Sequence, residues 1–184
     1  MTAVAVIGIF GISGVGKSRL VGQVAARIPH TLHLQGSALI KQGLADPSVS
    51  SEELRRASGD RIIANQRILI AMVNRAIAEH PSRLVLFDGH LLIDTPAEII
   101  EVQREVIAAL QLKLLVHVEA EPTQIAARRH GDAYRTRPDR DIATLAAHQN
   151  RSRDLCKAYG CLLGIPMHIV ESGDVDRLAE VCRN

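Results

Sequence analysis

The fold is decided by the apolar stretch Val4-Ala5-Val6-Ile7-Gly8-Ile9-Phe10, which runs directly into Gly11-Ile12-Ser13-Gly14-Val15-Gly16-Lys17-Ser18. A continuous β-branched run of this kind is typical of a central parallel strand that helices cover on both faces. The second stretch satisfies the pattern G-x-x-x-x-G-K-[ST] between a predicted strand and a predicted helix. We therefore predict a phosphate-binding loop, whose glycines let successive backbone N–H groups point at the phosphates of a nucleotide.

The side chains of this loop have distinct expected roles. Lys17 is expected to bind the β- and γ-phosphate oxygens, and the Ser18 hydroxyl is expected to ligate Mg²⁺. ATP and Mg²⁺ are accordingly the predicted nucleotide and metal, and the alternative is a glycine turn with a surface lysine. The residues expected to bind the nucleotide are Gly11, Ser13, Gly14, Val15, Gly16, Lys17 and Ser18.

Asp88 stands at the carboxyl end of another predicted strand. The run Leu-Val-Leu-Phe over residues 84–87 predicts a buried strand, and Asp88 follows it at the edge where ligands bind in open α/β sheets. Asp88 is expected to hold the magnesium, directly or through water, although a strand-end turn residue is the simpler interpretation. His90 is either a substrate ligand or a structural hydrogen-bond partner.

Further short apolar runs predict the rest of an α/β sheet. Five strands alternating with helices indicate a parallel sheet with right-handed crossovers, strand order 2-3-1-4-5 and helices on both faces. We expect a single domain over residues 1–184, with an acceptor-binding helical insertion at about 36–80. The other predicted strands cover residues 31–34, 84–87, 112–118 and 168–170.

Several helix starts are visible in the sequence. Ser50 and Glu53 have the spacing of a capping box and predict a long helix that ends near His80. Thr95 and the proline after it predict a second helix that runs to about Leu110. Further helices are predicted to begin at about Asp141 and at Asp174.

An arginine cluster follows the predicted fourth strand. Five arginines fall within thirteen residues of a chain whose formal net charge is only +2. Arginines on a mobile segment neutralise the charge that spreads over a transferring γ-phosphoryl group, so the cluster and the phosphate loop together indicate a kinase with a lid at about 128–141. The alternative is a solvated surface. The cluster comprises Arg128, Arg129, Arg135, Arg137 and Arg140.

Composition limits the other function classes. The 184 residues are 47% hydrophobic and 23% charged, enough apolar material for one packed domain. Aromatic residues make up only 2% and Trp is absent, which argues against a nucleic-acid partner that stacks its bases. The three cysteines show no CxxC spacing, and the apolar start is far shorter than the roughly 20 residues of a membrane span. We expect reduced thiols, no membrane partner and a cytoplasmic location, and the oligomeric state stays open.

The acceptor of the phosphoryl group is less clearly marked. The stretch Gln-Gly-Ser-Ala-Leu over residues 35–39 offers no carboxylate to activate a hydroxyl, whereas Arg55 at the head of the long helix suits an anionic acceptor. This favours a phosphate-bearing acceptor, although Asp88 remains a possible base. Two alternatives stay open: a kinase of a small hydroxylated metabolite, and a nucleotide-binding regulatory protein without catalysis.

The chain resembles the nucleoside monophosphate kinases, most closely the archaeal-type adenylate kinases, over nearly its whole length. The resemblance is carried by GISGVGKS (11–18), SSEELRRAS (50–58), LVLFDGHLLIDTP (84–96) and EAEPTQIAARRHGDAYRTR (119–137). It implies ATP- and Mg²⁺-dependent phosphoryl transfer to a nucleoside monophosphate, AMP first.

Site residues follow from the same resemblance. Arg55 matches the arginine that holds the monophosphate, and Gly36 and His90 match acceptor-binding positions. Two positions depart from the family pattern. Gly131 stands where the family often has a lid arginine, and Ser37 stands where an aspartate is usual. The catalytic set implied is Lys17, Asp88, Arg128, Arg135 and Arg137.

Overall fold

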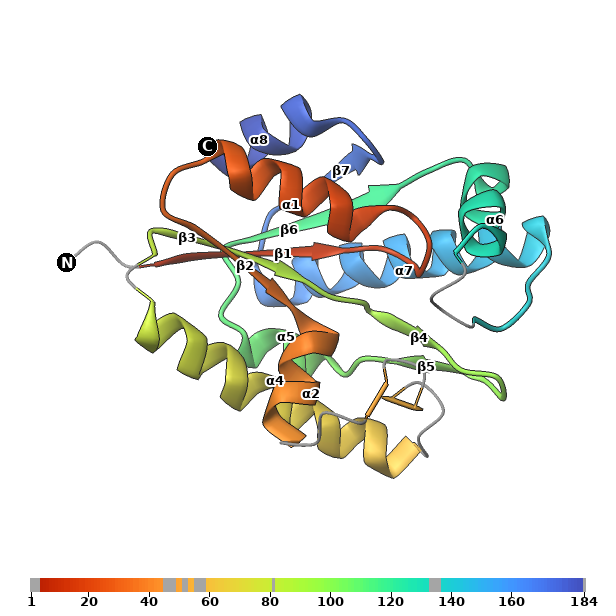
Figure 1. Ribbon diagram of the computed structural model, residues 1–184, viewed down its shortest axis with the longest axis horizontal. Coiled ribbons are helices and arrows are strands. Elements are labelled where there is room, and N and C mark those ends of the chain that lie inside the picture. Colours follow the sequence, from red (N-terminus) through yellow and green to blue (C-terminus); the bar gives the residue numbers. More distant parts are fainter. Residues whose placement is uncertain are drawn as a thin grey trace.

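The opening apolar run forms β1, the middle strand of a five-stranded parallel sheet (Figure 1). The structure, a computed structural model, describes residues 4–44, 49–50, 53–54, 59–80, 82–132 and 137–183. Two predicted site residues, Arg55 and Arg135, lie outside the described residues. The elements are β1 (Ala5–Phe10), α1 (Lys17–Arg27), β2 (Thr31–Gln35), α2 (Gly36–Leu44), α4 (Gly59–Glu79), β3 (Leu84–Asp88), β4 (Leu92–Asp94), β5 (Ile99–Glu101), α5 (Arg104–Ala109), β6 (Leu114–Glu119), α6 (Pro122–His130), α7 (Ile142–Leu163), β7 (Met167–Glu171) and α8 (Val175–Arg183).

The strand order of the main sheet is β2-β3-β1-β6-β7. This confirms the expected order 2-3-1-4-5, because β6 and β7 are the fourth and fifth strands of that sheet. Asp88 is in register with Ile9 of β1 and with Gln35 of β2. The register therefore brings the end of β3 beside the start of the phosphate loop.

Two hydrophobic cores cover the two faces of the sheet. Ile7 and Ile9 of β1 pack into one core with α1 and α8, whereas Val6 and Phe10 pack into the other with α4, α5 and α7. Figure 1 shows α1 and α8 on one side of the sheet and α4 and α5 on the other. The alternation explains why the strand is apolar at every position, since neither face meets solvent.

The segment after β3 differs from the prediction. A helix was expected from Thr95, but residues 92–101 form the antiparallel hairpin β4–β5, and the helix α5 begins only at Arg104. The Thr95 hydroxyl does accept a hydrogen bond from the Glu98 amide (2.9 Å), the contact a helix cap makes, but it also donates to the Glu98 carbonyl (2.7 Å) and closes a turn. The β-branched pair Ile99-Ile100 then continues as a strand, which overrides the helix start.

The long helix was expected to begin at Ser50, but α4 begins only at Gly59. The predicted hydrogen bonds at Ser50 are nevertheless present, and the starts predicted at Asp141 and Asp174 agree with α7 and α8. The Ser50 and Glu53 side chains accept hydrogen bonds from each other's backbone amides at 3.1 and 2.6 Å, a complete capping box. Asp141 caps α7 through the Thr144 amide (2.7 Å), and Asp174 accepts from the Arg177 amide (3.0 Å). Among the described helices, none has the length and apolar character needed to cross a membrane.

Candidate active site

The phosphate loop joins β1 to α1 at the carboxyl edge of the sheet. Gly14 and Gly16 have φ values of 92° and 97°, a left-handed conformation that glycine adopts without strain. The first turn of α1 contains no acidic residue and no side chain caps it, so its amide groups stay available to an anion. The loop forms one wall of a cavity, the phosphate cavity, lined also by His90, Arg128, Asp132 and Arg137.

Lys17 and Asp88 form a buried ion pair beneath this cavity. Lys17 Nζ lies 2.5 Å from Asp88 Oδ1, and the two side chains are 4% and 2% exposed. Burial raises the pKa of the Asp88 carboxyl, but the Lys17 charge, together with the nearby polar groups of His33 and Ser18, outweighs burial and holds that pKa well below its usual range. Asp88 is therefore a carboxylate at neutral pH.

The other oxygen of Asp88 has capacity for a further ligand. Asp88 Oδ2 is buried and accepts no hydrogen bond from the described residues, and the imidazole Nε2 of His33 lies 3.6 Å from it. Ser18, predicted to ligate the metal, accepts a hydrogen bond from Gln35 (3.2 Å). A hydroxyl and a carboxylate oxygen suit Mg²⁺, which takes one or two protein oxygens together with phosphate and water. The predicted metal ligands fit the ion.

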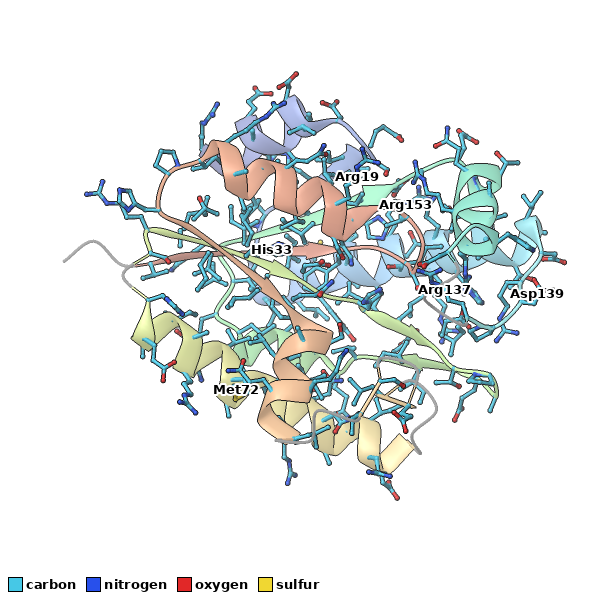
Figure 2. The ribbon with its side chains drawn as sticks, viewed as in Figure 1. Arg19, His33, Met72, Arg137, Asp139 and Arg153 are labelled. Atoms are coloured by element: carbon cyan, nitrogen blue, oxygen red, sulfur yellow. The ribbon has the colours of Figure 1, made fainter. Side chains whose placement is uncertain are left out.

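Two of the predicted lid arginines lie against the phosphate loop. Arg128 donates to the Val15 carbonyl (2.6 Å) and to the Ser172 hydroxyl (3.1 Å). Arg137 donates to the Ser13 hydroxyl (3.0 Å) and to the Asp132 carboxylate (2.6 Å), and Figure 2 shows Arg137 beside the turn between β1 and α1. Arg137 Nη1 is buried and donates to none of the described residues. The arrangement leaves one guanidinium nitrogen at the cavity for an anion.

Arg129 and Arg140 of the same cluster bind the protein itself. Both donate to Asp94 at the end of β4, Arg129 at 2.8 Å and Arg140 at 3.1 Å, and Arg140 also donates to the Thr95 carbonyl (3.0 Å). The side chain of Arg129 passes so close to Gly14 that a Cβ there would lie 2.6 Å from its Cγ. Arg129 and Arg140 therefore share the Asp94 carboxylate as their anionic partner and, unlike Arg128 and Arg137, do not line the phosphate cavity.

A second cavity adjoins the phosphate cavity and shares Ser13, Ser18 and His90 with it. It includes Gly36 and Asp88, two residues predicted for the site. None of the described residues that line it is Lys or Arg. Its apolar wall is formed by Phe10, Ile40, Leu54, Ile62, Leu69, Phe87, Leu92, Ile93, Val102, Val106, Ile107 and Leu110. Helices α4 and α5 and the hairpin thus build a mostly apolar chamber next to the phosphate loop.

Comparisons with known proteins agree with this geometry. The AAA domain family matches residues 10–146. The adenylate kinase of Saccharolobus islandicus is 33% identical over 147 residues, 73% of this chain and 73% of that enzyme. The adenylate kinase of Methanopyrus kandleri is 27% identical over 177 residues, 94% of this chain and 91% of that enzyme.

The chain belongs to the AAA domain family, as an adenylate kinase-like P-loop kinase. It is an ATP-dependent kinase of a nucleotide or another small molecule. Solved structures match this P-loop kinase in fold alone. Shikimate kinase from Acinetobacter baumannii in complex with shikimate has a TM-score of 0.59 at 14% identity, with 98% of this chain and 91% of that chain covered. The Deinococcus radiodurans tunicamycin resistance protein has a TM-score of 0.56 at 14% identity, with 89% of this chain and 97% of that chain covered.

Sequence reasoning missed one polar group within the P-loop kinase core. His117 of β6 is fully buried; its Nδ1 lies 3.1 Å from Glu119 Oε1, and its Nε2 lies 3.0 Å from the Ser152 hydroxyl on α7. Burial lowers the pKa of His117 to about 4, and the charges of Arg153 and Lys17 act in the same direction. Ser152 is also fully buried. The group therefore joins β6 to α7, and its serine is closed to substrate.

Proposed function

We propose that the protein transfers the γ-phosphoryl group of ATP to a nucleoside monophosphate, AMP first. The observation that carries the proposal is the junction of the two cavities at Ser13, Ser18 and His90. Phosphate held by the loop would face an acceptor in the second cavity across this junction. Direct transfer needs that side-by-side arrangement of donor and acceptor.

Cationic groups of the chain supply the charge neutralisation. Lys17 exchanges Asp88 for phosphate oxygens when the nucleotide enters, because one ammonium cannot hold both at full strength. Arg137 offers its unpartnered Nη1, and Arg128 is anchored at the Val15 carbonyl. Catalysis then rests on positioning and electrostatics, with no covalent intermediate on the protein.

The metal site proposed above uses Ser18 and Asp88. Held by these two residues, Mg²⁺ would supply positive charge against the negative charge that develops on the phosphate oxygens. Asp88 Oδ2 is the group that the chain keeps ionised and without a hydrogen-bond donor among the described residues. The Ser18 hydroxyl is held by its hydrogen bond from Gln35 at the end of β2.

A phosphate-bearing acceptor is supported by the chemistry of Asp88. In this structure the Asp88 carboxylate is paired with Lys17, which holds its pKa well below the usual range, and with nucleotide bound the same carboxylate is assigned to the metal. In neither role is it free to take a proton from an alcohol. A phosphate acceptor is already anionic and needs no such base. Arg55 is proposed to hold its phosphate, with residues 36–80 as the acceptor-binding part and residues 128–141 as the lid. The adenylate kinase relatives support AMP as the first candidate.

A hydroxylated small molecule is the second candidate. It is favoured by the second cavity, where no described lining residue is cationic and the Asp88 carboxylate is present. Incubation of the purified protein with ATP, Mg²⁺ and single acceptors separates the two. ADP formation that depends on AMP, CMP, GMP or UMP supports the proposal. Dependence only on a sugar, polyol or hydroxy acid overturns it, and ADP formation with no acceptor dependence indicates a nucleotide-binding protein without transfer.

A further inference from the structure

One polar residue lies in the apolar stripe of α4. Buried positions on this helix recur at Ile62, Leu69 and Val73, the spacing of a face packed against the core. Asn65 falls on the same face and is only 9% exposed. An apolar residue is expected at such a position, because Asn is both a poor helix former and costly to bury.

The carboxamide of Asn65 has no partner among the residues that the structure describes. It forms no hydrogen bond with the part of the chain that the structure describes, and it lines the second cavity. A buried amide without a partner costs on the order of 1–3 kcal/mol, and native proteins keep few such groups. Local rules are usually broken at functional sites, where a ligand completes what the fold leaves open.

The surroundings of Asn65 define what that ligand must offer. Its helical neighbours Ile62 and Leu69 line the cavity, and α5 contributes Val106 and Ile107 opposite. Such walls accept a flat or apolar body. Within them, a carboxamide presents one donor and one acceptor, which matches a nucleobase edge with an amino group beside a ring nitrogen.

We propose that Asn65 binds the base of the acceptor through two hydrogen bonds in the second cavity. This inference rests on the proposed nucleoside monophosphate kinase activity and specifies the acceptor: a monophosphate whose base carries an amino group next to a ring nitrogen, as adenine does. Asn65 is then a specificity residue, and its unpartnered amide discriminates against acceptors that lack this edge.

The test compares AMP with purine ribonucleoside 5′-monophosphate, which has the same ring, sugar and phosphate but no amino group. The wild type should use AMP with a kcat/KM about ten- to a hundredfold higher. In Asn65→Leu, which removes both polar atoms at similar volume, the ratio should fall to about one, because both acceptors lose the contact at the ring nitrogen and only AMP also loses the contact at the amino group. Asn65→Ala should give the same ratio. Because alanine is smaller than asparagine, this variant cannot overpack the site, so it controls for misfolding of Asn65→Leu.

Asn74→Leu is the matched control, since Asn74 lies on the same helix but is exposed and does not line the cavity. It should keep the wild-type ratio. Asn65→Leu should also melt at a higher temperature than the wild type, because it replaces a buried, unpaired amide. If the Asn65 variants lower kcat/KM equally for both acceptors, the residue only packs and the inference is overturned. If the wild type uses neither acceptor nor any other nucleoside monophosphate, the proposed function itself is wrong and this inference falls with it.

Discussion

Lys17 Nζ and Asp88 Oδ1 lie 2.5 Å apart where the phosphate loop meets the end of β3, and neither side chain is more than 4% exposed. Each residue is the counter-charge of the other in this structure. Under the proposed function, phosphate oxygens would compete for Lys17 and leave Asp88 to a metal ion. Nucleotide binding and metal binding would then be linked through a single contact.

Lys17→Ala is expected to reduce turnover by about a hundredfold or more, the usual effect of removing a cation from a transition state. It should also lower the free energy of unfolding by about 3 kcal/mol, because the Asp88 carboxylate stays buried without its partner. Steady-state kinetics and denaturant unfolding measure the two effects. The double variant Lys17→Ala/Asp88→Asn should recover part of the stability and none of the turnover. Near-normal turnover in Lys17→Ala would contradict the role given to this lysine.

Arg137→Ala is expected to lower kcat more than it raises the KM for ATP. Its Nη1, which donates to none of the described residues, is proposed to meet charge that is greatest in the transition state. Arg177→Ala is the control, because Arg177 pairs with Glu180 on the exposed face of α8. An unchanged kcat in Arg137→Ala would mean that the lid segment is a solvated surface.

Asp94→Ala is expected to destabilise the fold by about 3 kcal/mol, because two guanidinium groups lose their common carboxylate and Arg129 is only 7% exposed. The comparison is Glu180→Ala, which breaks an exposed pair and should cost under about 1 kcal/mol. Urea unfolding of both variants gives the difference. Equal stability of the two variants would show that the Asp94 cluster contributes no more than a surface ion pair.

The buried histidine gives a pH prediction. The pKa of His117 falls from about 6.5 in the unfolded chain to about 4 in the folded protein, so the unfolded chain binds the extra proton first. Its contribution to stability is therefore complete above about pH 6.5 and is lost as the pH falls toward 4. Between pH 7 and pH 5 the loss should be about 2 kcal/mol. His117→Gln should lack this part of the pH dependence, and identical slopes in both proteins would refute the assignment.

The sequence predicted those features that depend on contiguous residues. Gly14, Gly16 and Lys17 stand within one loop, and their spacing alone specified the turn from β1 into α1. The position of Asp88 followed from a strand that ends in a carboxylate. These predictions succeed because the conformation of the loop depends on residues within it, and each strand is marked by its own apolar run.

Other features depend on contacts between distant segments. Arg129 and Asp94 are thirty-five positions apart, and the arginine cluster alone does not reveal a carboxylate partner within the protein. From the sequence, Asn65 is only one polar residue in a helix. Its burial and its place in the wall of the second cavity become visible only in the structure. At Thr95 the sequence pattern is ambiguous. The hydrogen bond from the Glu98 amide to the Thr95 hydroxyl occurs both in a helix cap and in a hairpin turn.

The central claim is that the γ-phosphoryl group passes from ATP to AMP across the junction of the two cavities. The most direct measurement uses ATP labelled at its γ-phosphorus, with unlabelled AMP and Mg²⁺, and follows where the label goes. Our account predicts that the label appears at the β-position of ADP formed from AMP, only when AMP is present, and at least a hundredfold more slowly with Lys17→Ala. Label found only in inorganic phosphate or on a hydroxylated acceptor, with AMP left unchanged, would contradict it.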